Sequence, residues 1–365
     1  MLSSRVLRSL SLLKPRVSSV NTFVERREIK TWLKNTLVEM KDRDRDFDLI
    51  PHKQRHRREW IDWNYDCEIF AFNARLGEKL PLDKLKGVFI DQSYVDEESR
   101  KNKELGLEGV GVEFESNRKL AEKGERIMKQ FIASYLRFFL PRVPEEGILS
   151  ILENLCSDKN LSHISGYIGC TELIMSPLVN PTDVMLSTAV KSLLGLLEET
   201  SGSQQCQKFI IDIILPYLND KDLLEIWNPI SPEIKVQQIL QNDGLPQFEA
   251  RLLRETGRNT IFSCYTVGLY VNKNLLGYGP GESIEIAKEM AAYDTLRRFF
   301  NLTPSQVLFK FGPPAHNLDY TSKLNQTNPP LKDWKLSDFN ENIFDHNSKQ
   351  QNQHQKPDTK IAASM

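Results

Sequence analysis

The sequence has little cysteine, and its cysteines form no close pair. Five thiols are spread over 365 residues, at Cys67, Cys156, Cys170, Cys206 and Cys264. Zinc sites and disulfide frameworks need cysteines at short, recurring spacings, so this distribution argues against both. We expect reduced and mostly buried thiols.

Long apolar runs and an excess of one charge are also missing. No run reaches the roughly 20 apolar residues that a membrane-spanning helix needs. The 48 Lys and Arg residues nearly balance the 49 Asp and Glu residues, so any nucleic-acid surface has to be local. With 40% hydrophobic and 27% charged residues, the composition is that of a globular chain long enough for two domains.

The N-terminal stretch lacks acidic residues before Glu25. Its cations stand among serines and leucines, at Arg5, Arg8, Lys14 and Arg16. This pattern is typical of a mitochondrial transit peptide, which we predict for residues 1–28. A secretory signal would need an unbroken apolar core, which Arg5 and Arg8 interrupt; a disordered basic tail is the other alternative.

Residues 29–60 carry dense charge of both signs. The cations of the second half are Lys53, Arg55, Arg57 and Arg58. Such a run is usually a solvated surface, but its density also makes this basic extension a candidate for phosphate contacts.

Residues 61–222 favour an all-α domain. Apolar residues recur at three-to-four spacing over 66–78, 117–139, 145–155, 183–199 and 205–217. Helices should stop at the interrupting prolines, which are Pro81, Pro141, Pro144, Pro177 and Pro181. No period-2 alternation of any length appears.

Residues 228–301 indicate a different, α+β domain. Ser231 and Pro232 mark the start of a short capped helix that ends at Asn242–Gly244. Three alternating runs follow, QFEARLLRET, IFSCYTVGLYVN and LLGYGPG, with turn signals at Gly257 and at Asn272–Asn274.

An amphipathic helix over 282–300 closes this domain. The residues expected to face inward are Ile286, Ala287, Met290, Ala291 and Leu296. The order is therefore α-β-β-β-α, with both helices able to cover one sheet face. Residues 302–365 are polar, and we expect a largely irregular tail with anchoring points around Phe309 and Trp334.

The α-β-β-β-α block, with GYGPGES before a helix that contains AKEMAA, resembles a double-stranded-RNA-binding domain. Such domains read duplex shape over roughly 16 base pairs. The resemblance implies phosphate contacts from a KKxAK cluster, whose positions here run from Ile284 to Lys288 and keep only Lys288. It also places Gln238 toward a minor groove and leaves Arg258 as the cation of the first strand loop.

RNA contact should then be spread over basic residues outside the usual cluster. We expect it chiefly from the 53–58 segment, Arg254, Arg258 and Lys288. Because the electrostatic part of binding scales with the phosphates neutralised, free duplex RNA should bind weakly.

The helical block resembles ribonuclease III. DCEIFAFNARLGEKLPLDKLKGVFIDQSYVDEE matches the entry of that fold, with Asp91–Tyr94 on the family's HxSY. NRKLAEKGERIM falls on the signature NERLEFLGDxxL, anchored by Asn117, Leu120 and Gly124, and STAVKSLLG falls on ADxxEAxxG, anchored by Gly195. The family's metal-binding carboxylates then correspond to Arg118, Ala121, Glu125, Thr188 and Lys191.

This resemblance implies an inactive nuclease that needs no metal or other cofactor. A cation about 4 Å from Mg²⁺ exchanges attraction for a repulsion of roughly 4 kcal/mol at an effective dielectric of 20, and Arg118 and Lys191 would each do this. A shifted register that pairs Glu122 with Glu125 gives up the anchors, and the partner helix still offers Thr188 and Lys191. Two-metal hydrolysis needs carboxylates from both helices.

The combination resembles the family of ribonuclease III-like proteins of the mitochondrial large ribosomal subunit. It implies a structural constituent of that subunit in the mitochondrial matrix, with rRNA and other mitochondrial ribosomal proteins as partners. A free RNA-binding factor and an active RNA-processing nuclease are the alternatives. Dimerisation through the ribonuclease III-like domain is left open.

Overall fold

The computed structural model describes residues 31–49, 63–106, 115–219, 221–258, 260–303 and 309–339. Predictions made for residues 1–28 and for Lys53, Arg55, Arg57 and Arg58 lie outside these ranges. The chain divides into two compact units, Met1–Arg55 and His56–Met365. In the described part of the first unit, α1 spans Thr31–Leu49, a charged stretch in which we had not predicted a helix.

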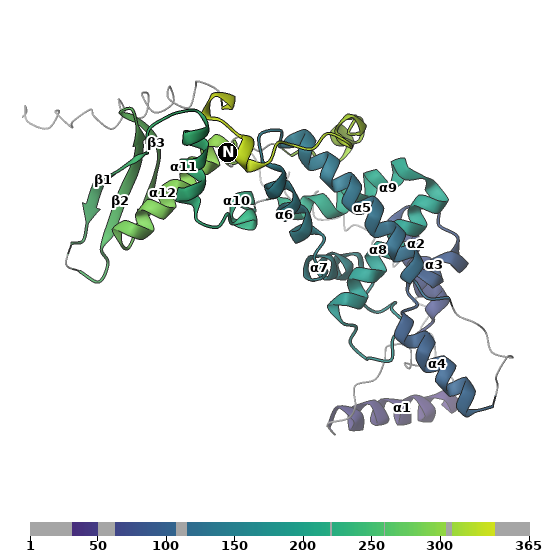
Figure 1. Ribbon diagram of the computed structural model, residues 1–365. Helices are drawn as coiled ribbons and strands as arrows, with labels where there is room; N and C mark the ends of the chain where they lie inside the picture. The colour runs from purple at the N-terminus through teal and green to yellow at the C-terminus, as the bar shows by residue number, and fades with distance from the viewer. Residues whose placement is uncertain are drawn as a thin grey trace, which may run out of the picture. The chain divides into compact units, whose positions relative to one another are not determined.

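The second unit begins with a helical domain, as the sequence predicts (Figure 1). Its helices are α2 (Tyr65–Leu76), α3 (Leu82–Val88), α4 (Gln92–Glu104), α5 (Arg118–Phe139), α6 (Glu145–Leu155), α7 (Asp158–Ile168), α8 (Asp183–Ser201), α9 (Ser203–Phe209) and α10 (Leu223–Trp227). An isolated parallel bridge joins Ile90 to Met175. Among the described helices of the chain, none combines the length and apolar character that crossing a bilayer requires.

The last predicted helix of this domain, over 205–217, is broken. After α9 the chain forms a π-helical turn, Ile210–Ile214, and then a 3₁₀ turn, Leu215–Leu218. Pro216 supplies the reason, because it has no N–H for the ladder of a continuing α-helix. Four helices of this domain, α3, α4, α7 and α10, were not predicted. α3 and α10 are short, with 7 and 5 residues, and α4 is strongly charged, so their apolar spacing carries little signal.

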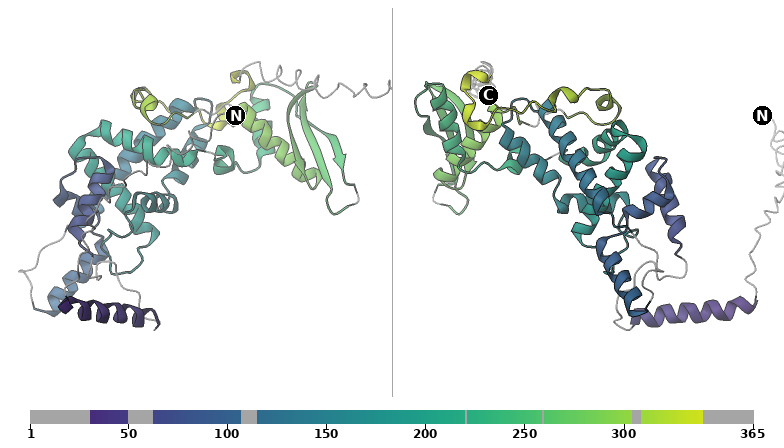
Figure 2. Two further views of the ribbon diagram at one scale, coloured as in Figure 1. Left: turned by 180° about the vertical axis from the view of Figure 1, so that it is seen from behind. Right: turned by 45° about the vertical axis from the view of Figure 1, so that its right-hand side comes forward.

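The second domain has the predicted α-β-β-β-α order. Its elements are α11 (Pro232–Asn242), β1 (Glu249–Thr256), β2 (Cys264–Val271), β3 (Asn274–Gly281) and α12 (Ile284–Phe299). The sheet is antiparallel in the order β1-β2-β3. Asn272 and Lys273 form the β2–β3 turn with φ of 50° and 69°, as the tightest hairpins require. Both helices lie on one face of the sheet, and the views in Figure 2 show the same layering.

Alternating glycines let α12 lie directly on β3. A Cβ atom at Gly279 would be 2.3 Å from the Ala291 nitrogen, and one at Gly281 would be 2.5 Å from the Ala287 nitrogen. A side chain at either position would therefore force the helix off the strand.

Two details of this domain differ from the prediction. Ser231 precedes α11 as expected, but it adopts a φ of 54° and its side chain makes no capping hydrogen bond. Ile286 and Met290 were expected to face inward, yet they are 47% and 45% exposed. The buried residues of α12 instead include Ala292, Thr295 and Phe299. Small side chains are required only where β3 approaches most closely, at Ala287, Ala291 and Thr295.

The tail segment 309–339 is irregular in backbone but packed. It contains α13 (Pro313–His316) and 3₁₀ turns at Thr321–Lys323, Leu331–Asp333 and Leu336–Asp338. The Tyr135 hydroxyl of α5 donates to the Lys310 carbonyl at 2.7 Å. At the other end, Trp334 stacks on Phe339, which stacks on Phe299 of α12. The tail segment thus contacts both domains.

Three of the five cysteines, Cys156, Cys170 and Cys206, are buried and all five are free thiols. Burial raises the pKa of Cys156 to about 11. At neutral pH that thiol is therefore protonated and packs as a small apolar group.

Candidate functional site

The candidate site lies where α5 crosses α8, and two glycines set that crossing. A Cβ atom on Gly124 would lie 1.8 Å from the Lys191 carbonyl oxygen, and one on Gly195 would lie 2.2 Å from the Leu120 carbonyl oxygen. The two helix backbones therefore touch at this point. This contact brings the Arg118–Glu125 stretch of α5 beside the Thr188–Lys191 stretch of α8, which is the register that the family resemblance implies.

Asn117 fixes the start of α5. It is 3% exposed, and its Nδ2 donates to the Val88 carbonyl at 3.0 Å. The same carbonyl accepts from Ser192 Oγ of α8 at 3.1 Å. One carbonyl at the end of α3 therefore positions both helices of the site, which gives Asn117 a structural role.

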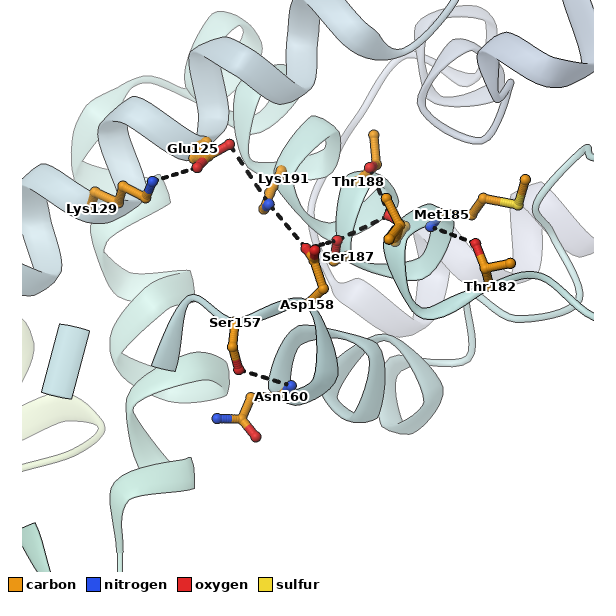
Figure 3. Close-up of polar contacts among 11 residues, drawn as sticks. Glu125, Lys129, Ser157, Asp158, Asn160, Thr182, Met185, Ser187, Thr188 and Lys191 are labelled. Carbon is orange, nitrogen blue, oxygen red and sulfur yellow. Dashed lines mark hydrogen bonds and ion pairs between the residues drawn. The ribbon is translucent and has the colours of Figure 1, made fainter. Parts of the chain in front are cut away.

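The Lys191 ammonium occupies the centre of the site (Figure 3). Its Nζ lies 3.7 Å from Glu125 Oε2 and 3.4 Å from Asp158 Oδ1. Glu125 Oε1 also meets Lys129 Nζ at 2.5 Å, and Ser187 Oγ donates to Asp158 Oδ1 at 2.6 Å. The Lys191 side chain is only 14% exposed, so the ammonium lies within the cluster.

The charges of this cluster balance. Two carboxylates, Glu125 and Asp158, face two ammonium groups, Lys129 and Lys191. The hydrogen bond from Lys129, with a further contribution from Lys191, holds the pKa of Glu125 below its ordinary value. The same hydrogen bond raises the pKa of Lys129. Both carboxylates of this cluster are therefore neutralised by cations of the chain itself.

The other positions that the family resemblance names, Arg118, Ala121 and Thr188, carry no carboxylate. Arg118 is exposed, and its Nε lies 3.8 Å from Glu122 Oε1. Ala121 is buried. Thr188 Oγ1 donates to the Val184 carbonyl one turn earlier, at 2.7 Å. The shifted register with Glu122 gains nothing, because that side chain is 70% exposed and faces Arg118.

The donor set does not fit a divalent metal. Mg²⁺ takes several oxygen ligands, whereas the group between the two carboxylates here is an ammonium. In the part of the chain that the structure describes, no three His, Cys, Asp or Glu side chains gather to hold an ion.

The sequence did not point to Asp158 or Lys129. Asp158 opens α7, where Ser157 Oγ accepts from the Asn160 N–H at 3.4 Å. The Ser-Asp pair is a helix-start signal, but nothing in the sequence brings α7 against α8. Lys129 lies one turn after Glu125, and that spacing could have indicated the pair.

The predicted RNA-binding residues fall into two groups. Gln238 on α11 and Arg254 on β1 are exposed. Arg258 and Lys288 are already paired within the domain, at 3.4 Å from Glu255 and 2.5 Å from Glu233. Lys288 also lies 5.8 Å from the centre of the Phe248 ring. The last lysine of the usual phosphate cluster thus has an acidic partner.

Two family models match the chain. One, described as the endonuclease domain of large ribosomal subunit protein mL44, matches residues 64–197. The other, described as the MRPL44 dsRNA-binding domain, matches residues 227–335. The second range includes most of the tail segment that packs on both domains.

The chain is also similar to individual proteins, with sequence identities between 14% and 30%. The large ribosomal subunit protein mL44 of Caenorhabditis elegans is 30% identical over 293 residues, which cover 80% of this chain and 73% of that protein. Ribonuclease 3 of Ligilactobacillus salivarius is 23% identical over 223 residues, which cover 60% of this chain and 90% of that protein. The solved nuclease domain of ribonuclease III from Campylobacter jejuni is 14% identical with a TM-score of 0.35, covering 42% of this chain and 98% of that one.

Proposed function

The chain belongs to the family of large ribosomal subunit protein mL44, and on this premise we propose that it is a structural constituent of the mitochondrial large ribosomal subunit. The observation that carries the proposal is the 30% identity with a mitochondrial ribosomal protein over 80% of the chain, which spans both domains. The partners are rRNA and neighbouring ribosomal proteins. Residues 1–28 would direct the chain to the mitochondrial matrix and be removed there.

We propose that the ribonuclease III-like domain does not cleave RNA. Two-metal phosphodiester hydrolysis holds its ions with carboxylates from both helices. On α8 the corresponding positions are Thr188 and Lys191, and the Lys191 ammonium lies between Glu125 and Asp158. Metal entry would require that ammonium to leave two carboxylates that it neutralises.

RNA contact is proposed to depend on assembly. Arg258 and Lys288 each have a carboxylate within 3.4 Å, so phosphate would have to compete with an internal partner. Gln238, Arg254 and the 53–58 segment are the remaining candidates. Since each phosphate contact contributes about one unit of salt dependence, so small a set supports only weak binding to a free duplex.

Sucrose-gradient sedimentation of a mitochondrial extract tests the structural role. The full chain should migrate with the large subunit and stay there after a high-salt wash. A chain that remains at the top of the gradient, or leaves the subunit at modest salt, would favour a free RNA-binding factor.

A nuclease assay tests the inactive site separately. Purified protein with Mg²⁺ or Mn²⁺ should cleave double-stranded RNA no faster than a mock preparation. Metal-dependent cleavage that disappears in Glu125→Ala would overturn the proposal.

A further inference from the structure

One end of the α+β domain carries an exposed apolar band. Its members are Ile234 near the start of α11, Ile261 and Phe262 in the β1–β2 loop, and Ile284 at the start of α12. They are 57%, 95%, 88% and 54% exposed, in that order. Exposed apolar residues scattered singly need no explanation, but a cluster marks an interaction site.

A hydrogen bond and an ion pair join the three elements that carry this band. Ser263 Oγ, beside Phe262, donates to the Glu282 carbonyl just before α12 at 3.4 Å. Lys288 of α12 pairs with Glu233 of α11, beside Ile234, at 2.5 Å. Figure 1 shows the β1–β2 loop at the same end of the sheet as the starts of α11 and α12. The β1–β2 loop therefore lies beside the start of α12, and α12 lies beside the start of α11.

The band carries a net negative charge. Arg258 and Lys288 are each matched by a carboxylate, Glu255 and Glu233. Glu282 and Glu285 are exposed, and no ion pair joins them to another residue that the structure describes. These two carboxylates flank Ile284 in the sequence. An exposed apolar side chain therefore lies next to negative charge that no described cation neutralises.

We propose that this apolar band, with Glu282 and Glu285, binds a basic segment of a neighbouring protein whose Lys or Arg residues flank apolar side chains. Apolar side chains of the partner would cover Ile234, Phe262 and Ile284, and its cations would meet the two carboxylates. The inference goes beyond the proposed ribosomal role and rests on it only for the place where the partner is encountered. In this proposal a protein segment, and not duplex RNA, occupies the surface on which a duplex would be expected.

A duplex fits this surface poorly for two reasons. RNA binding through this end of such a domain depends on neutralising phosphates, and Glu282 and Glu285 add negative charge where phosphate would lie. Burying four apolar side chains also gains nothing against a hydrated phosphate backbone, whereas it contributes to a protein interface. Complementary charge would then set the orientation of the bound segment.

Photo-crosslinking of the full chain tests the proposal. Benzoylphenylalanine replaces Ile284 in one variant and Phe262 in another, mitochondria are irradiated intact, and the crosslinked species are identified by mass spectrometry. Both positions should reach one protein segment that has net positive charge and apolar residues. Crosslinks to rRNA, to an acidic segment, or to nothing at either position would overturn the proposal.

A charge variant with a matched control completes the experiment. Glu282→Lys with Glu285→Lys should lower the crosslink yield from position 262 about tenfold, since attraction becomes repulsion. Asp243→Lys with Glu249→Lys makes the same charge change at the other end of the domain and should leave the yield unchanged. Equal losses in both pairs, or in neither, would contradict the proposed surface. The gradient position of the chain reports the ribosomal role independently of the crosslink.

Discussion

At the scale of single residues, Lys191 is the central residue of the candidate site, because it pairs with both carboxylates of the cluster. Its ammonium is mostly buried and lies between Glu125 and Asp158, so it supplies the positive charge that a metal ion would supply in a nuclease. Removing one partner of such a cluster leaves the others uncompensated, and that loss costs more than the ion pair contributes.

Lys191→Met tests this role while keeping most of the side-chain length. We expect a loss of about 1 to 2 kcal/mol in the free energy of unfolding, between the values for exposed and buried ion pairs. Urea denaturation at neutral pH measures it. Lys159→Met, at an exposed lysine beside Asp158 on α7, is the control and should change stability little. Equal losses of unfolding free energy in the two variants would contradict a stabilising role for the Lys191 ion pairs.

Glu125→Gln tests the same cluster by pH. The pKa of Glu125 is lowered by Lys129 first and by Lys191 second, from an ordinary value of 4.5. A lowered carboxyl pKa stabilises the fold above the unfolded-state value and loses that contribution as the pH falls through the folded-state value. The variant should therefore cost about 0.5 kcal/mol at pH 7, a figure reduced for partial exposure.

The cost should shrink below about pH 4.5 and disappear at more acid pH. Glu122→Gln, at the exposed carboxylate three residues earlier, serves as the control with a smaller effect at every pH. A penalty for Glu125→Gln that persists or grows on acidification would contradict the assignment.

At the scale of elements, the crossing of α5 and α8 depends on glycine rather than on apolar side chains. Large residues on both sides would hold two helices 8–10 Å apart. At Gly124 and Gly195 each helix instead meets the backbone of the other. The site geometry follows from this contact, because Lys191 reaches Glu125 only across closely packed helices.

Gly195→Ala should separate the two helices. The new methyl would lie 2.2 Å from the Leu120 carbonyl oxygen, so we expect a loss of about 3 kcal/mol, at the upper end of overpacking effects. Thermal unfolding measures it. Gly166→Ala, in α7, places its new methyl with no atom from outside the local helix within 4 Å, and it should instead stabilise by about 0.5–1 kcal/mol. Similar destabilisation by both changes would count against the close crossing.

The sequence predicted the elements that bury a regular apolar face and missed those that do not. The range predicted for α6 coincides with the observed one, and α5 begins one residue after its prediction. The charged α4 buries no residue, so periodicity has nothing to detect. Ile286 and Met290 were assigned inward by hydropathy, but β3 approaches α12 too closely for them.

The candidate site was predictable only as far as the family motifs reach. They name Glu125, Thr188 and Lys191 on two helices that the periodicity also finds. Asp158 stands on a third helix, and its partner Lys191 is 33 positions away. That pairing arises from the packing of α7 against α8, which no local pattern in the sequence specifies.

At the scale of the whole molecule, the tail segment 309–339 ties the helical domain to the α+β domain. Asn328 is its central contact with the helical domain: its N–H donates to Glu145 Oε2 at 2.9 Å, and its Nδ2 donates to the Leu140 and Val143 carbonyls at 3.0 and 2.7 Å. Glu145 is itself paired with Arg137 at 2.6 Å. At the α+β domain, Asn242 Nδ2 donates to the Trp334 carbonyl at 2.9 Å.

This arrangement predicts that both domains unfold together and that Asn328→Ala uncouples them. The variant removes the side-chain donor to the Val143 carbonyl, whereas the Leu140 carbonyl keeps its hydrogen bond from the Val143 N–H. Leaving one buried carbonyl without a donor costs about 1–3 kcal/mol. Differential scanning calorimetry should show one transition for the parent chain and two for the variant, with the α+β domain melting first because it has the smaller core. Asn317→Ala is the control. Asn317 lies in the same segment, and its Nδ2 donates within that segment to the Pro313 carbonyl at 3.5 Å. If Asn328→Ala lowers the melting temperature but keeps a single transition, the tail segment stabilises the helical domain without coupling it to its neighbour.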